Sequence, residues 1–383
     1  MRRPTFAIFA CALLTSLLAA PPAGAAPARQ ISYQTWDLPS AQRTLPTGVD
    51  RRSWTSPWAT PGFALTRLVA SWEARTPGRS RVRIDVRGKA GASTSSWDTL
   101  AVWAQGDRHF KRTTRGEQAD DLGSVSVDTW VVPDGVTSYQ LRVTLLRRAG
   151  QKASPRVDTV GAMSSLLPSV SSVPTSKPGV ARGVVLDVPA YSQMVHRGHY
   201  PEYGAGGEAW CSPTSTAMVL GYYDALPGAA AYSWVPAGHP DPWVDHVARM
   251  TYDYAYEGTG NWPFNTAYAA TRVDHAFVTR LRSLREAEEL VRAGIPVVAS
   301  IAFDPGGLTG APIGSTDGHL LVIVGFTADG DVVVNDPAAA TDAEVRRTYD
   351  RGEFENAWIP TSGGTVYVIA DAAHPLPAGH TNW

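Results

Sequence analysis

The chain has 383 residues and a formal net charge of −1 at pH 7, a balance that argues against a surface built for nucleic acid or for an anionic membrane. Charged residues make up only 18%, and 35 glycines, 29 prolines and 13 tryptophans are typical of a loop-rich, aromatic-rich protein rather than a helical bundle. The length exceeds one typical core, so we expect two domains.

Residues 1–25 have the pattern of a secretory signal peptide. Arg2 and Arg3 form a basic start, residues 6–20 are apolar, and Ala23-Gly24-Ala25 offers a cleavage site. No apolar run reaches the length of about 18 residues that would span a bilayer. We therefore predict a secreted, extracellular protein with no membrane span, exported by the general secretory route, with the twin-arginine route as the alternative.

Residues 26–161 predict an antiparallel β-sandwich. Short runs in which polar and apolar residues alternate recur between turn signals, as expected for strands with one solvent-exposed face. The runs are 63–72, 80–86, 99–104, 123–132 and 138–146. No convincing helix interrupts them. The layout is similar to that of galactose-binding-like domains, and this resemblance implies a jelly-roll-like topology.

Six tryptophans of this segment could either stack on sugar rings or fill the core. Trp72 and Trp103 lie within alternating runs and are expected in the core, whereas Trp54 and Trp58 follow Ser, Thr and Pro and are the better surface candidates. Cell-wall carbohydrate is therefore a candidate partner of the first domain. The six are Trp54, Trp58, Trp72, Trp97, Trp103 and Trp130.

Residues 162–183 are rich in Ser and Pro and lack periodicity, which predicts a linker. The second domain then spans 184–383. Because such a linker separates cores, we expect the second domain to act independently, so that deletion of 26–165 leaves activity on small peptides largely intact.

Cys211 is the single cysteine that remains once Cys11 leaves with the signal peptide. A lone thiol in a secreted chain forms no internal disulfide and is exposed to oxidation, which favours a catalytic nucleophile over a small buried helix cap. Ser212 as N-cap and Pro213 at the next position predict a helix to Tyr223. The positive end of that helix would lower the thiol pKa.

His319 is the strongest candidate base among nine histidines, although a core-edge histidine is the ordinary alternative. It heads the apolar run 320–326, which predicts a strand buried on both faces, and 331–336 predicts the next strand. A strict two-residue turn between the strands would leave Asp336 about 13 Å from His319. We therefore expect a wider loop or a bulge, with Asp336 rather than Asn335 orienting the imidazole.

Three further segments carry weaker signals. His196 and His199 could approach a metal, but no third ligand follows at a useful spacing, so we expect neither a metal nor another cofactor. Residues 252–262 are aromatic and polar enough to line a cleft, and Gly206-Gly207 would let a substrate backbone approach. Residues 283–294 predict a capped amphipathic helix.

Four segments together resemble the C39-like branch of the papain-like cysteine peptidases: Gln193, Trp210 to Thr214, Gly318 to Phe326, and Val334 to Pro337. The resemblance covers residues 184 to about 372 of the 383. It implies an α+β fold in which a helix carrying Cys211 packs against an antiparallel sheet carrying His319 and Asp336. It also implies that Gln193 donates to the oxyanion beside the Cys211 N–H.

The sequence thus predicts a secreted cysteine peptidase acting on a peptide or protein substrate through a thioester at Cys211. His319 would be general base and then acid, Asp336 would orient it, and Gln193 would stabilise the oxyanion. Two alternatives stay open. A cell-wall amidase or isopeptidase would use the same groups on peptidoglycan stem peptides, and a non-catalytic extracellular binding protein would leave Cys211 unreactive toward iodoacetamide.

Overall fold

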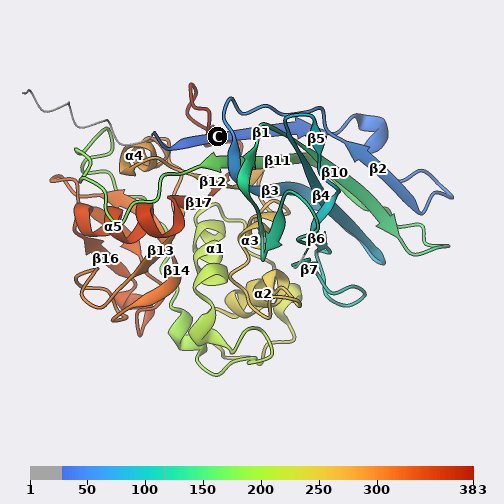
Figure 1. The fold of residues 1–383 in the computed structure, drawn as a ribbon. Helices are drawn as coiled ribbons and strands as arrows, with labels where there is room; N and C mark the ends of the chain where they lie inside the picture. The colour runs from blue at the N-terminus through green and yellow to red at the C-terminus, as the bar shows by residue number, and fades with distance from the viewer. Residues whose placement is uncertain (1–27, 117) are drawn as a thin grey trace, which may run out of the picture.

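The computed structural model describes residues 28–116 and 118–383, so the predicted signal peptide, 1–25, lies outside the described residues. Two β-rich domains lie side by side, with α1 and α3 between them in the view of Figure 1. Within the described ranges, no helix combines the length and apolarity needed to cross a membrane.

The first domain consists of two antiparallel sheets that share one core, as predicted. One sheet has the order β1-β11-β3-β9-β8, and the other has the order β2-β10-β4-β6-β7 with β5 beside β4. Trp72, Trp103 and Trp130 are buried in the shared core. The strands are β1 (Gln30–Asp37), β2 (Arg51–Thr55), β3 (Leu65–Arg75), β4 (Ser80–Ala90), β5 (Ser93–Thr94), β6 (Asp98–Trp103), β7 (Thr113–Thr114), β8 (Ser124–Ser126), β9 (Thr129–Val136), β10 (Ser138–Arg147) and β11 (Arg156–Leu166).

Two details of this domain differ from the sequence prediction. The run 123–132 is a hairpin rather than one strand, because Val127 adopts a left-handed φ of 52° between β8 and β9. Strand β11 continues to Leu166, so its last five residues, 162–166, occupy the start of the predicted linker. Residues 162–165 are buried between β1 and β3, which a Ser-rich composition does not reveal.

The second domain is built on one antiparallel sheet with the order β12-β17-β13-β14-β15-β16. Helices α1 to α3 cover one face of the sheet, and α4 and α5 cover the other. The strands are β12 (His275–Arg280), β13 (Val297–Phe303), β14 (Thr316–Phe326), β15 (Val332–Asn335), β16 (Arg346–Tyr349) and β17 (Thr365–Ala370). The helices are α1 (Cys211–Tyr222), α2 (Pro242–Thr251), α3 (Trp262–Ala269), α4 (Leu284–Arg292) and α5 (Arg351–Ser362).

Periodicity predicted the centre of this domain well. Residues 320–326 are all buried, and side chains 320–324 alternate between the cores on the two faces of the sheet. The bulge after Ile323 changes this phase, so that Phe326 packs in the same core as Ile323. Helix α4 begins after Ser283, whose side chain accepts the Arg285 N–H, and it ends before Gly294 with a φ of 80°. Both features confirm the predicted capped helix.

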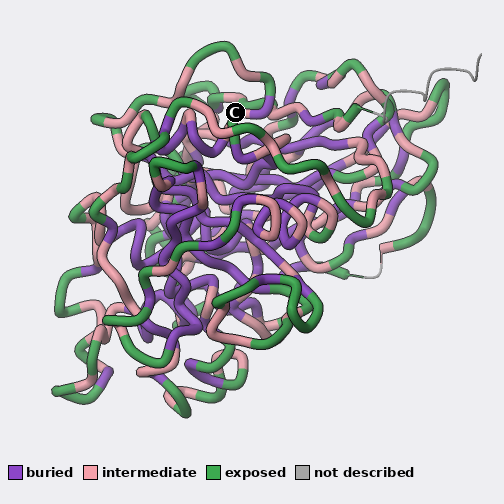
Figure 2. The backbone as a smooth tube through the Cα atoms, turned by 90° about the vertical axis from the view of Figure 1, so that its left-hand side faces the viewer, coloured by how far each residue is buried: buried purple, intermediate pink, exposed green. Residues whose placement is uncertain are grey.

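The two domains share an interface, so the expectation that a linker separates their cores is wrong. Phe264 and Ala267 of α3 belong to the core of the sandwich. The buried Arg112 guanidinium donates across the boundary to the carbonyls of Arg249 and Tyr252, at 2.8 and 3.2 Å. Buried backbone runs through the middle of the molecule, while exposed segments lie mostly in peripheral loops (Figure 2). The Ser and Pro content of a linker predicts that the linker itself is exposed to solvent. It does not predict whether the domains on either side pack against each other.

The connecting segment after Leu166 is itself attached to the second domain. The Ser176 N–H donates to the Glu355 carboxylate at 2.6 Å, and the Gly179 and Ala181 N–H groups donate to Glu288 at 2.7 and 3.1 Å. Both carboxylates are buried, so the contacts hold the backbone of the segment against α4 and α5.

Candidate active site

Cys211 is the first residue of α1 and lines an open cleft. The helix begins two residues earlier than predicted, after Trp210, whose side chain makes no capping hydrogen bond. Ser212, the expected cap, instead places its Oγ 2.9 Å from the Tyr367 hydroxyl on β17. One turn later, Ser215 Oγ donates to the Leu320 carbonyl at 3.1 Å, which fixes α1 against β14.

His319 and Asp336 meet under this helix. His319 Nε2 lies 2.7 Å from Asp336 Oδ1, and the two residues are 3% and 1% exposed. The predicted bulge is present, because Ile323 pairs with Val334 and Gly325 pairs with Val333, which leaves one extra residue on β14. The bulge shifts the register of β15 and carries Asp336 toward His319.

The electrostatics of the three side chains favour charge separation. Burial acts to lower the pKa of His319, but the Asp336 carboxylate and then Cys211 raise that pKa to about 10. Burial acts to raise the pKa of Cys211, but the hydrogen bond and charge of His319, with the Leu320 and Ser212 backbone, leave that pKa below its usual value. Because Nε2 of His319 faces Asp336, Nδ1 is left for the sulfur. The arrangement favours a thiolate beside an imidazolium.

Tyr349 is a member of the site that sequence reasoning missed. Its hydroxyl donates to Asp336 Oδ2 at 2.7 Å, while the Ala338 N–H donates to Oδ1 at 3.0 Å. Burial acts to raise the pKa of Asp336, but His319, Tyr349 and Ala338 outweigh it and leave the pKa lowered. Tyr349 ends β16, the strand beside β15. The strand pairing that brings it there has no signature in residue spacing.

Gln193 lies in a short 3-10 turn, Gln193–His196, rather than at a strand end. Its side-chain Nε2 donates to the Glu208 carbonyl at 2.7 Å, and its backbone N–H donates to the Pro337 carbonyl at 2.8 Å. These two bonds connect Gln193 to Pro337, which follows Asp336, and to Glu208, which lies three residues before Cys211. One N–H of its amide remains available, since an amide nitrogen has two.

Gly206 and Gly207 allow close packing against this turn, and the approach of a substrate backbone to them stays a prediction. A Cβ on Gly207 would collide with the carbonyl of His196, and a Cβ on Gly206 would lie 3.0 Å from the carbonyl of His199. Gly206 also has a φ of 95°. The two glycines let the segment before Cys211 pack closely on the turn that carries Gln193.

The cleft has a volume of about 670 Å³ and lies between the two domains. The second domain contributes Cys211, residues 256–260 and Trp262, so most of the aromatic stretch predicted to line a cleft does so. The first domain contributes Arg67 and the β8–β9 hairpin, residues 126–129. A chain lying in this cleft would contact both domains.

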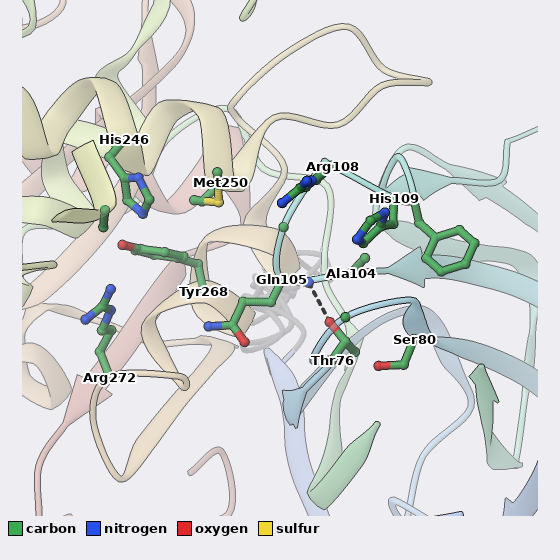
Figure 3. Close-up of a pocket in the computed structure, with 14 residues that line it drawn as sticks. Thr76, Ser80, Ala104, Gln105, Arg108, His109, His246, Met250, Tyr268 and Arg272 are labelled. Carbon is green, nitrogen blue, oxygen red and sulfur yellow. Dashed lines mark hydrogen bonds between the residues drawn. The ribbon is translucent and has the colours of Figure 1, made fainter. Parts of the chain in front are cut away.

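A second cavity of about 430 Å³ also lies at the domain boundary (Figure 3). Helices α2 and α3 present His246 and Tyr268 to it, and the first domain presents Gln105 and Arg108. Burial, and then the charge of Arg272, lower the pKa of His246 to about 4, which makes it a weak base. Among the described residues, the lining contains neither a cysteine nor a carboxylate.

The tryptophans divide largely as predicted. Trp72 and Trp103 are core residues, and Trp58 is half-buried. Trp54, predicted at the surface, is half-buried and packs against the core of the sandwich. The Trp58 ring is covered by Lys89, whose Nζ lies 4.1 Å from the ring centroid, and by Arg87 at 5.3 Å. A sugar ring stacking on Trp58 would have to displace these cations.

Comparisons with known proteins identify a family for both domains. A family model described as "Peptidase C39 N-terminal domain" matches residues 25–165, and one described as "Peptidase_C39 like family" matches residues 185–366. A comparison with curated proteins found no match. Among solved structures, a complex of the Aeromonas sobria serine protease with its chaperone ORF2 is similar at 9% identity and a TM-score of 0.22. That match covers 37% of this chain and 27% of the solved chain.

Proposed function

Because this chain belongs to the C39-like peptidases, we propose that it is a secreted cysteine peptidase that cleaves peptide bonds in the cleft between its two domains. The observation that carries the proposal is the alignment of Cys211, His319 and Asp336. A thiol with a lowered pKa lines the cleft, and the imidazole that lowers it lies 2.7 Å from a buried carboxylate. A cysteine with a purely structural role would require neither the imidazole nor the carboxylate.

The chemistry follows from these positions. The Cys211 thiolate attacks the scissile carbonyl carbon, and the free N–H of Gln193 with the N–H groups at the start of α1 stabilises the resulting oxyanion. The C–N bond then breaks, and His319 gives its proton to the departing amine. His319 next removes a proton from a water molecule, which attacks the thioester and releases the acid and the thiolate. Asp336 keeps the imidazole oriented throughout.

Three finer points belong to the same proposal. The arrangement of a nucleophile helix against a sheet supports a papain-like second domain, and the two stacked sheets support a jelly-roll, galactose-binding-like first domain. The signal-like residues 1–25 support secretion. Half-buried tryptophans on the first domain support contact with cell-wall carbohydrate, once their covering cations move.

The test is turnover of a diverse peptide library by the mature chain, with Cys211→Ala as the control. We expect cleavage by the wild type and none by the variant, which should keep the wild-type melting temperature because Cys211 begins a helix and fills no cavity. Stoichiometric labelling of the wild type by iodoacetamide at neutral pH should accompany activity. Turnover that survives in Cys211→Ala would refute the mechanism. Release of stem peptides from purified peptidoglycan without cleavage of any library peptide would favour the amidase instead.

A further inference from the structure

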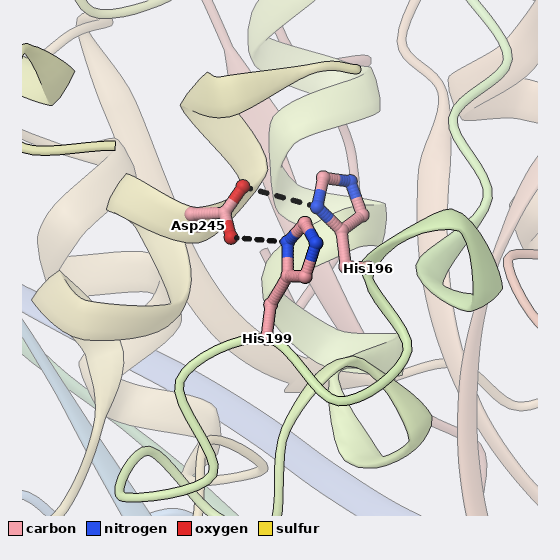
Figure 4. Close-up of side chains that lie close together, drawn as sticks. All are labelled: His196, His199 and Asp245. Atoms are coloured by element: carbon pink, nitrogen blue, oxygen red, sulfur yellow. Dashed lines mark hydrogen bonds and ion pairs between the residues drawn. The ribbon is translucent and has the colours of Figure 1, made fainter. Parts of the chain in front are cut away.

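A cluster of two imidazoles and a carboxylate lies apart from Cys211, His319 and Asp336. His196 is the last residue of the turn that carries Gln193, His199 follows that turn, and Asp245 comes from α2 (Figure 4). One ligand atom from each residue can be chosen so that all three lie within 4.8 Å of one another. The sequence expectation that no third ligand accompanies the two histidines is therefore wrong. Asp245 follows His199 by 46 residues, and only the fold brings it there.

The side chains of the cluster lie close together, but several of their polar atoms make no hydrogen bond. His199 Nδ1 lies 3.1 Å from Asp245 Oδ1 in hydrogen-bond geometry, and His196 Nδ1 lies 3.0 Å from Asp245 Oδ2 without it. His196 and Asp245 are fully buried. Within the described ranges, three atoms of the cluster have no hydrogen-bond partner: the two ring nitrogens of His196 and Oδ2 of Asp245. A buried imidazole with no hydrogen bond at either nitrogen is costly, because it has lost its water and its 3.0 Å contact with Asp245 is an ion pair only if the ring is protonated.

A divalent cation would remove that cost. Two imidazoles and a carboxylate are the ligand set that Zn²⁺ and similar borderline metals prefer. Ligand atoms at about 2.0–2.2 Å from a tetrahedral zinc lie about 3.3 Å apart. The two separations between histidine nitrogens and Asp245 oxygens, 3.0 and 3.1 Å, are close to this value, and one ligand atom from each residue can be chosen within 4.8 Å of the other two. A fourth position is left for water or for His239, whose ring centroid lies 4.2 Å from that of His199.

From this geometry we infer that His196, His199 and Asp245 form a binding site for a divalent transition-metal ion, with Zn²⁺ as the first choice. The ion would join the turn Gln193–His196 to helix α2. That turn carries Gln193 and packs against Gly207, four residues before Cys211. The metal would therefore be structural and would hold the segment that leads into α1. This inference stands whether or not the chain is a peptidase.

The test is Zn²⁺ titration of the metal-stripped full chain by calorimetry, together with the absorption spectrum of the Co²⁺ form. Both are done in a Cys211→Ala background, because a thiol beside an imidazole can itself bind zinc. We expect one ion per chain, a tetrahedral Co²⁺ spectrum and a melting temperature that rises with Zn²⁺. His199→Gln, chosen because the His199 side chain is 18% exposed, should weaken binding by more than about 100-fold. Changes outside the ligand set typically cost 10–100-fold.

The matched control is His246→Gln. His246 is the next residue after Asp245 on α2 and is also mostly buried, but it lies outside the cluster. This variant should keep the stoichiometry and affinity of the background. Absence of zinc binding to a folded background chain would overturn the inference. So would binding that persists in His199→Gln and in Asp245→Asn, or that is lost equally in His246→Gln. The Co²⁺ spectrum decides the question even if a variant does not fold.

Discussion

The imidazole of His319 lies between two groups that both favour its charged form. Asp336 acts on Nε2 and Cys211 on the opposite side of the ring, and together they overcome the effect of burial on the pKa. Tyr349 keeps the second carboxylate oxygen of Asp336 occupied. Both shifts favour a proton on His319, where the proposed mechanism requires it for the departing amine, and an ionised sulfur at Cys211.

The pH dependence of kcat/KM should reflect the pairing of Cys211 with His319. Thiolate is lost as pH falls through the lowered pKa of Cys211, and the acid form of His319 is lost as pH rises through its pKa of about 10. Activity should therefore extend well into the alkaline range. Asp336→Asn removes the charge that raises the His319 pKa, so the alkaline limb of kcat/KM should move to lower pH and kcat should fall about 10²–10⁴-fold.

Asn335→Ala is the control for that experiment. Asn335 is fully buried, and its amide donates to the carbonyls of Val188 and Pro189 at 3.1 and 3.0 Å. Its loss should lower the melting temperature and leave the pH limbs of the folded fraction in place. An alkaline limb that moves equally in both variants would mean that Asp336 acts only through the fold.

Gln193→Ala should reduce kcat by about 10²–10³-fold and change KM little, because an oxyanion donor acts only when charge develops on the carbonyl oxygen. Iodoacetamide labelling of Cys211 forms no oxyanion and should persist. The measurement is steady-state kinetics beside the rate of alkylation. A variant that loses both turnover and thiol reactivity would show that Gln193 merely holds the Glu208 segment in place.

At the scale of elements, the strongest predictions came from patterns that are local in sequence. The apolar run 320–326 indicated β14, and the capping residues indicated α4. The distance that a two-residue turn would leave between His319 and Asp336 indicated a wider loop or a bulge, and the bulge is present. Contacts made by tertiary pairing were not predictable. Tyr349 reaches Asp336 through the pairing of β15 with β16, and Asp245 reaches His196 from another helix. The hairpin at Val127 was not predicted, because the alternation of polar and apolar residues continues on both sides of its turn.

The loop that lines the cleft, residues 252–262, is held by one buried carboxylate. Asp253 accepts hydrogen bonds from Thr114 Oγ1 of the first domain at 2.7 Å and from Asn261 and Ala255 of the loop, each at 2.9 Å. A hydrogen bond to a charged group contributes about 1.5–3 kcal/mol. Weakening the hydrogen bonds to Asp253 should reduce the affinity for substrate more than it reduces the rate of the chemical step.

Asp253→Asn should therefore raise KM about tenfold, as a loss of about 1.4 kcal/mol implies, and leave kcat within about twofold. Thr114→Val removes only the bond that crosses between the domains, and it should give a smaller change in the same direction. Peptide kinetics measure both effects. A fall in kcat at constant KM would place this loop in the chemical step instead.

At the scale of the whole molecule, the cleft belongs to neither domain alone. The β8–β9 hairpin and Arg67 form one wall, and the loop anchored by Asp253 forms another. Deletion of residues 26–165 would remove the first wall and expose Phe264 and Ala267 to water. The truncated chain should consequently aggregate or lose activity.

Co-expression of 28–166 and 167–383 as two chains should restore a complex that co-purifies and cleaves peptides. The experiment measures co-elution and turnover. A truncated chain that stays monomeric and fully active would contradict the shared cleft, and two halves that fold separately and never associate would do the same.

The carboxylates of Glu288 and Glu355 have a practical consequence for anyone who divides this protein into pieces. Proteases need several residues of extended, detachable backbone, and the N–H groups of Ser176, Gly179 and Ala181 are already engaged. Limited digestion with a broad-specificity protease should spare this Ser- and Pro-rich stretch and cut first at exposed loop tips. A boundary chosen from composition would instead sever the packing of α4 and α5, so domain exchange between relatives should keep the connecting segment with the second domain.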